Sequence, residues 1–127
     1  MSRRIIHSDN APAAIGPYSQ AVADETTLYC SGQLGLDPAT GALAEGAAAQ
    51  ARQAFTNLKN VIEAAGASME DIMKVTIFLT SMDNFGAVNE AMQAFCSAPY
   101  PARSCFAVAA LPKGGLVEIE AIVSLKR

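Results

Sequence analysis

The chain has 127 residues, of which 51% are hydrophobic and only 17% charged, which predicts a single domain over residues 1–127 with an ample core. The formal charge of −3, without any cluster of Lys or Arg, removes the usual electrostatic basis for a nucleic-acid partner. The low charged fraction also predicts that further subunits cover part of the surface.

The N-terminal segment, the cysteines and the single histidine exclude several other classes. Residues 8–10 turn polar before the apolar core of a signal peptide could form, and no apolar run could span a membrane, so we expect a cytoplasmic protein without a membrane partner. Cys30, Cys96 and Cys105 are widely spaced and odd in number, which predicts reduced thiols. His7 is the only histidine, which disfavours a His-containing zinc site and a Ser-His-Asp triad.

Periodicity predicts two strands, a helix and a third strand over the first 80 residues. Residues 18–23 and 27–33 are extended-type segments on either side of a polar break, which predicts a hairpin. Residues 72–80 alternate and predict a strand with Met73, Val75, Ile77 and Leu79 on one face. Between them, apolar residues at steps of four and three predict a helix that stops at Gly66 and buries Ala51, Phe55, Leu58, Ile62 and Ala65.

A second helix and two more strands complete the chain. Asp83 is the expected N-cap of a helix that carries Phe85, Val88, Met92 and Phe95. Residues 103–111 and 116–125 predict the last strands, and the element order predicts two βαβ crossovers in a two-layer α+β sandwich. The sheet face opposite the helices is too apolar for water, so a partner subunit is expected to cover Tyr29, Ser31, Thr76, Phe78, Glu118, Glu120 and Ile122.

Two of these strands carry the residues best suited to chemistry. Arg103 could bind the carboxylate of a small acid through its planar fork of donors, although a surface or interface salt bridge is the commoner role. Glu118 and Glu120 point the same way, and either could be a general base if partly desolvated, or part of a solvated face. In a simple hairpin Glu118 would lie about 20 Å from Arg103 at strand rise, so a site that uses both would span subunits.

Three further positions have weaker signals. Tyr18 could place its hydroxyl in a site, with ordinary packing as the default. Ser31 and Gly32 offer a polar contact and a close approach to backbone, but they do not form the motif of a serine nucleophile. Cys105 could be a nucleophile, although a partly buried structural thiol is the commoner case.

Taken together, these segments resemble the RidA (YjgF) family of enamine/imine deaminases over nearly the whole chain and in the same order. The matching segments are residues 10–18, 31–33, 49–53, 60–66, 71–74, 85–89, 101–105 and 117–122. The resemblance implies a chorismate-mutase-like homotrimer, with the last strand inserted between the two βαβ units and active sites between subunits. The predicted fold class is therefore an α+β two-layer sandwich, with a mixed six-stranded sheet and two helices on one face.

The resemblance also implies roles for individual residues and no cofactor or metal. Arg103 resembles the carboxylate-binding arginine, Glu118 the glutamate that positions water, and Tyr18 a third catalytic residue that could supply a proton for tautomerisation. The remaining positions that match the substrate pocket are Cys105, Ser31, Gly32 and Asn89.

The implied substrates are short 2-imino acids and their enamine tautomers, such as 2-aminoacrylate, which escape from pyridoxal-phosphate enzymes and are hydrolysed to 2-keto acids and ammonia. Such imines already hydrolyse in water, so a protein need only hold the acid and aim a water molecule. Two rival functions are a module that binds keto acids or proteins without turnover and, less favoured by the acidic composition and the lone histidine, an RNA-cleaving enzyme.

Overall fold

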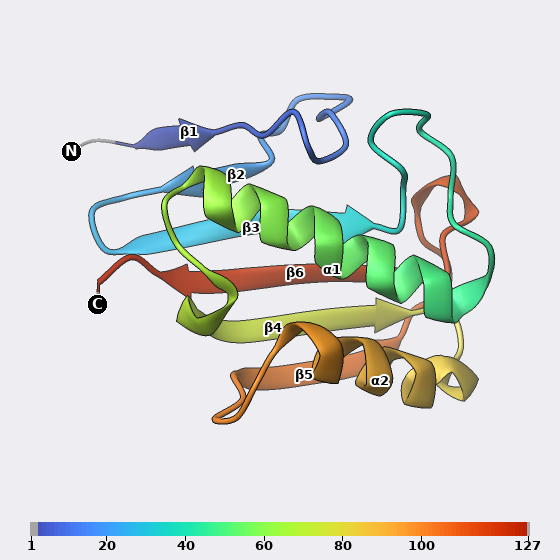
Figure 1. Cartoon of the computed structure of the whole chain (residues 1–127). Coiled ribbons are helices and arrows are strands. Elements are labelled where there is room, and N and C mark those ends of the chain that lie inside the picture. The colour runs from blue at the N-terminus through green and yellow to red at the C-terminus, as the bar shows by residue number, and fades with distance from the viewer. Residues whose placement is uncertain (1–2, 127) are drawn as a thin grey trace.

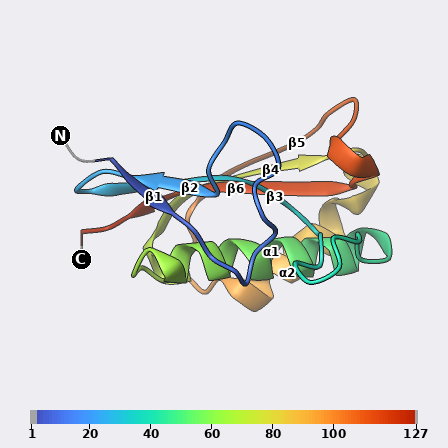
Figure 2. The same ribbon diagram turned by 90° about the horizontal axis from the view of Figure 1, so that it is seen from above.

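The computed structural model describes residues 3–126, which form one six-stranded sheet with two helices packed on a single face (Figures 1 and 2). The helices are α1 (Gly46–Ala64) and α2 (Phe85–Phe95). The strands are β1 (Arg4–Ile6), β2 (Ala21–Ala23), β3 (Thr27–Leu34), β4 (Ile72–Leu79), β5 (Ala102–Ala107) and β6 (Val117–Ser124). Short 3₁₀ turns are η1 (Met69–Asp71), η2 (Met82–Asn84) and η3 (Pro112–Gly114). The predicted α+β fold with a mixed six-stranded sheet is confirmed.

The last strand of the chain lies in the middle of the sheet. The strand order is β1-β2-β3-β6-β4-β5, with β6 antiparallel to β3 and β4, and β4 parallel to β5 (Figure 1). β3 and β4 therefore run parallel to each other, so α1 and α2 each connect a parallel pair. The two predicted βαβ units are confirmed. β5 and β6 do not form a hairpin, because β4 lies between them.

The core lies between the helices and the sheet. Phe55, Leu58 and Ile62 on α1 are fully buried, as the predicted stripe requires, and they belong to one cluster with Val75 and Ile119 from the sheet. Full burial of a side chain of this size contributes roughly 1.5–3 kcal/mol, so the stripe fixes α1 firmly across the sheet. Within residues 3–126, no helix is long and apolar enough to cross a membrane.

Two predictions about individual residues are wrong. Met73 is 61% exposed, because the pairing of β4 with β6 shifts register between Ile72 and Lys74, and Ile72 takes the buried position. Asp83 is not the N-cap of α2: it lies inside η2, and its backbone N–H donates to the hydroxyl of Ser81 at 3.1 Å. The first error arises from an irregular strand pairing, and the second arises because a 3₁₀ turn precedes α2.

Several predicted boundaries also differ. α1 begins at Gly46, ahead of Ala51, the first residue of the predicted stripe, because a run of small residues supplies its first turn without an apolar stripe. β5 ends at Ala107 rather than at residue 111, and only Ala21–Ala23 of the first predicted strand is extended. β1 was not predicted: it has only three residues, too few for a periodic pattern, and it is a strand because it pairs with β2.

The sheet face opposite the helices has the mixed character expected of it. Tyr29, Phe106 and Ile122 are 53%, 45% and 40% exposed, and the Phe78 ring packs edge-on against Phe106 with centroids 5.4 Å apart. Glu118 lies on this face beside Phe78 of β4. Clustered aromatic and branched side chains of this kind mark a surface suited to association.

Candidate functional site

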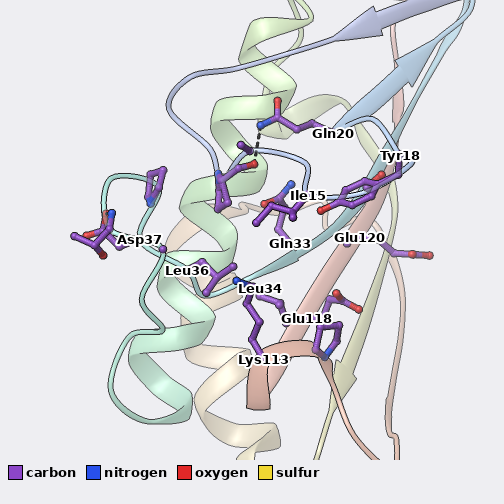
Figure 3. Close-up of a pocket in the computed structure, with 18 of the residues that line it drawn as sticks. Ile15, Tyr18, Gln20, Gln33, Leu34, Leu36, Asp37, Lys113, Glu118 and Glu120 are labelled. Atoms are coloured by element: carbon purple, nitrogen blue, oxygen red, sulfur yellow. Dashed lines mark hydrogen bonds between the residues drawn. The ribbon is translucent and has the colours of Figure 1, made fainter.

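A cavity of about 870 Å³ brings together the predicted site residues of the N-terminal half with Glu118. Its walls come from the loop before β2, from β3, from residues 36–41, from η3 and from β6. Figure 3 shows Tyr18 and Ile15 projecting into it from one side, and Glu118 and Lys113 from the other. Of the predicted residues, Tyr18, Ser31, Gly32 and Glu118 line this cavity.

The Glu118 carboxyl is the most perturbed acid in this cavity. The side chain is half-buried, and this desolvation raises the pKa of Glu118 above its ordinary value, with the nearby negative charge of Glu120 adding to the shift. Glu120 lies on the same face of β6 but is exposed. The two carboxylates, equivalent in sequence, therefore differ in environment, and Glu118 is the better candidate for a general base.

The loop that carries Tyr18 is held in place by a buried amide. Gln20, only 2% exposed, accepts a hydrogen bond through its side chain from the N–H of Ser8 at 2.7 Å. Its side-chain amide also donates to the carbonyl of Pro12 at 2.8 Å, the bond that Figure 3 draws. These bonds tie residues 8–12 to the start of β2 and so close the loop on which Ile15 and Tyr18 stand. Sequence reasoning gave Gln20 no role.

Two polar residues on α1 anchor the other walls. Asn57 is fully buried and donates to the carbonyls of Leu34 and Leu36 at 3.0 and 2.9 Å, at the end of β3. The side-chain oxygen of Gln50 accepts from the N–H of Leu116, just before β6, at 2.8 Å. Both were missed, although a polar residue inside an apolar helical stripe is a signal, because burial without a partner costs free energy.

Ser31 and Lys113 contribute different polar groups to the same cavity. The Ser31 hydroxyl donates to the carbonyl of Ser19 at 2.6 Å, so only its lone pairs are available to a ligand. Lys113, which sequence reasoning also left out, has φ 59° and ψ 18°, a left-handed conformation that is uncommon outside glycine, and it places an ammonium group on the cavity wall.

Arg103 lies in a second, smaller cavity of about 340 Å³. Asn89, Met92, Gln93, Tyr100 and Pro101 line it with the arginine. Arg103 Nη1 donates to the side-chain oxygen of Asn89 at 2.5 Å and approaches Met92 Sδ at 3.8 Å, and the guanidinium carbon lies 5.2 Å from the centre of the Phe85 ring. The predicted residues Arg103 and Asn89 are therefore neighbours.

Cys105 lies on the same strand as Arg103, two residues further along. Partial burial raises the pKa of the Cys105 thiol, and the positive charge of Arg103 opposes the shift only in part. The group is therefore a protonated thiol at neutral pH, which does not favour a nucleophile. Burial raises the pKa of Cys30 to about 12 and also raises that of Cys96, and all three cysteines are free, as predicted.

Arg103 and Glu118 do not meet within one chain. In the parallel pairing of β4 with β5, Arg103 lies beside Val75, which faces the helices, whereas Glu118 lies beside Phe78 on the opposite face. β4 also separates the two strands that carry them. The structure thus holds two partial sites, one with Arg103, Asn89 and the neighbouring Cys105, the other with Glu118, Tyr18, Ser31 and Gly32.

Comparison with known proteins gives a consistent result. Residues 8–125 match the family model described as endoribonuclease L-PSP. A goat (Capra hircus) protein named 2-iminobutanoate/2-iminopropanoate deaminase is 50% identical over 121 residues, which cover 94% of this chain and 88% of the relative. A Salmonella typhimurium protein of the same name is 48% identical over 122 residues, which cover 94% and 95%.

Solved structures extend the likeness to the fold. RidA from Psychrobacter sp. matches with a TM-score of 0.94 and 52% identity, over 96% of this chain and 99% of that one. Escherichia coli TdcF with bound serine matches with a TM-score of 0.90 and 40% identity, over 95% and 98%. With these matches along almost its whole length, the chain belongs to the RidA (YjgF) family, the family of the endoribonuclease L-PSP model.

Proposed function

We propose that this protein is a 2-iminobutanoate/2-iminopropanoate deaminase, a hydrolase that converts short 2-imino acids and their enamine tautomers to 2-keto acids and ammonia. The observation that carries the proposal is the half-buried Glu118 carboxyl, which faces a cavity and has a pKa raised by desolvation. The names of relatives at 45–50% identity support the same reaction.

Arg103 is the proposed anchor for the substrate carboxylate. Within residues 3–126, Arg103 donates its side-chain hydrogen bonds from Nη1 alone. The edge formed by Nε and Nη2 is therefore available for a bidentate pair with a carboxylate. The partial site around it is small and lined by polar and apolar groups, which suits a short acid.

Glu118 is the proposed base for the addition of water. One proton of the attacking water passes to Glu118 as the water oxygen bonds to the imine carbon, and the imine nitrogen takes up a proton from solvent water to give a neutral carbinolamine. Glu118 then returns its proton to the amino nitrogen, the C–N bond breaks as the carbinolamine hydroxyl loses its proton to solvent to form the C=O group, and ammonia leaves the 2-keto acid. Help of this kind is typically worth about 10² to 10⁴-fold in rate.

The remaining predicted residues would complete the pocket. Tyr18 would exchange a proton during enamine-to-imine tautomerisation, and Ser31 and Gly32 would contact the substrate beside Glu118, since all four residues line one cavity. On the other side, Cys105 would contribute contacts next to Arg103, and Asn89 would act mainly through the bond that it accepts from the arginine.

We further propose that the two partial sites are joined across subunits of a homotrimer in the cytoplasm. Two observations support this arrangement: Arg103 and Glu118 lie on opposite faces of one sheet, and the face with Glu118 carries exposed Tyr29, Phe106 and Ile122. A neighbouring copy that covers this face could bring its own Arg103 to the Glu118 cavity.

The rival functions are a module that captures keto acids without turnover and an RNA-cleaving enzyme, as the name of the family model suggests. The net charge of −3, with three carboxylates (Asp37, Glu118 and Glu120) on the larger cavity and one lysine, supports a small acid over a polyanionic strand.

One experiment separates these functions. 2-Aminoacrylate is generated in situ, and the disappearance of its imine is followed with and without the protein, in parallel with incubation of the protein with single-stranded RNA. The deaminase requires faster loss of the imine and stoichiometric ammonia. No acceleration over buffer, with 2-ketobutyrate still bound, would favour the binding module, and RNA cleavage without imine hydrolysis would favour the nuclease.

A further inference from the structure

One stripe of α2 surrounds the guanidinium of Arg103. Phe85, Asn89 and Met92 stand at positions i, i+4 and i+7, so they share one face of the helix, and each contacts the arginine. Asn89 and Met92 approach the same nitrogen, Nη1, whereas Phe85 presents its ring to the guanidinium carbon at 5.2 Å. The sequence pattern assigned Phe85 and Met92 only to the core.

These contacts constrain different motions. A hydrogen bond at one nitrogen fixes where that edge of the guanidinium lies, but the plane can still tilt about the bond. An aromatic ring within about 6 Å attracts the cation and opposes that tilt. The Nε and Nη2 edge is then held in one direction before any ligand arrives, which lowers the entropic cost of a bidentate pair.

We propose that Phe85 is a positioning residue for the carboxylate-binding arginine: its ring holds the plane of Arg103 so that the free edge meets the substrate carboxylate. The inference rests on the proposed function for its substrate, but the contact itself needs no ligand. The contact with Arg103 distinguishes Phe85 from Phe95, the other phenylalanine of α2. Phe95 stacks on Phe55 with ring centroids 5.6 Å apart and has no described contact with Arg103.

Three variants separate this role from simple packing. Phe85→Leu keeps an apolar side chain at this half-buried position but removes the aromatic ring, and Phe85→Tyr keeps the ring. Phe95→Leu is the matched control, since it makes the same change on the same helix away from the arginine. The Kd of 2-ketobutyrate is measured by calorimetry, and kcat and KM are measured for imine hydrolysis.

Phe85→Leu should weaken 2-ketobutyrate binding and raise KM by about two- to fivefold, as expected for an exposed cation–π contact, with kcat little changed. Phe85→Tyr should restore both values. Phe95→Leu should lower Tm without changing either. If Phe85→Leu and Phe95→Leu behave alike, or if Phe85→Tyr is as impaired as Phe85→Leu, Phe85 has only a packing role and the inference is wrong.

A readout without ligand keeps this inference separate from the proposed function. Rotation about the Nε–Cζ bond of Arg103, followed by ¹⁵N NMR, should be slow in the unaltered protein and in Phe95→Leu, and clearly faster in Phe85→Leu. Absence of imine hydrolysis by the unaltered protein would overturn the proposed function alone. Unchanged rotation in Phe85→Leu would overturn the role of Phe85 alone.

Discussion

The side chain of Glu118 lies directly over Gly32 on the neighbouring strand: a Cβ atom on Gly32 would be 2.8 Å from Glu118 Cδ and 3.1 Å from its Oε2. Contacts below 3 Å are too short for carbon atoms, so the carboxyl can occupy this position only because residue 32 has no side chain. The glycine thus determines where the proposed base stands.

Gly32→Ala should therefore lower kcat with little loss of stability, because the flexible end of Glu118 can move aside but leaves its working position. A displacement of about 1 Å can cost on the order of 100-fold in rate. The matched control is Gly35→Ala, where the new Cβ would lie 2.5 Å from the backbone of Gln50. That contact cannot relax so easily, and it should cost about 1–3 kcal/mol in the free energy of unfolding. Equal loss of Tm in both variants would contradict the distinction.

Arg103 and Glu118 should fail in different ways when altered. Arg103→Lys keeps the charge but loses the planar fork, so the affinity for 2-ketobutyrate should fall at least about tenfold. Glu118→Gln should leave that affinity nearly intact and lower kcat by about 10² to 10⁴-fold. Calorimetry and imine hydrolysis are measured for each, with Glu120→Gln as the control on the same face. If Glu120→Gln loses imine hydrolysis while Glu118→Gln keeps it, Glu120 rather than Glu118 is the general base.

The pH dependence of kcat/KM should report the environment of Glu118. The base must be ionised to take a proton from water, so activity should fall as pH drops through the pKa of Glu118, which desolvation and Glu120 raise. Glu120→Gln removes the neighbouring negative charge and should move this acidic limb to lower pH. Glu90→Gln, on exposed α2 surface, should not move it. If the acidic limb of the kcat/KM profile does not move in Glu120→Gln, the charge of Glu120 does not affect the pKa of Glu118 in the way proposed.

The same shift predicts how Glu118 affects stability. Because its pKa is raised on folding, the folded state holds this proton more tightly than the unfolded state, so the stabilising contribution is complete below the ordinary value of 4.5 and is lost as pH rises through the folded pKa. The glutamine in Glu118→Gln cannot ionise, so this variant avoids the cost of a half-buried charge. The Tm of the variant minus the Tm of the unaltered protein should therefore be more positive at neutral pH than below pH 4.5. Thermal melts across this range give the comparison.

Mixed oligomers test whether the site is shared. Arg103→Ala and Glu118→Gln subunits should each be inactive alone, but random mixing in a cyclic trimer would pair an intact Arg103 with an intact Glu118 at about one quarter of the sites. Activity after subunit exchange should therefore recover to about that fraction of the unaltered level. With exchange confirmed by mass spectrometry, no recovery would place the whole site within one chain.

Local chemistry in the sequence was enough to predict both helices and five of the six strands, and to single out candidate residues. The stripe of Phe55, Leu58 and Ile62 predicted α1, because a helix must bury one face. Alternation in residues 117–123 predicted that Glu118 and Glu120 share a face, because side chains alternate along a strand. Such rules depend only on neighbours along the chain.

Only the tertiary structure decided which of these residues meet. The exposure of Met73 follows from an irregular pairing with β6, and Asn89 contacts Arg103 because α2 packs beside β5. Alternation cannot say that β6 lies between β3 and β4, or that Arg103 and Glu118 lie on opposite faces of the sheet. Strand order and register are decided by pairing between segments far apart in sequence, and the free energy of that pairing comes from the assembled core rather than from any local pattern.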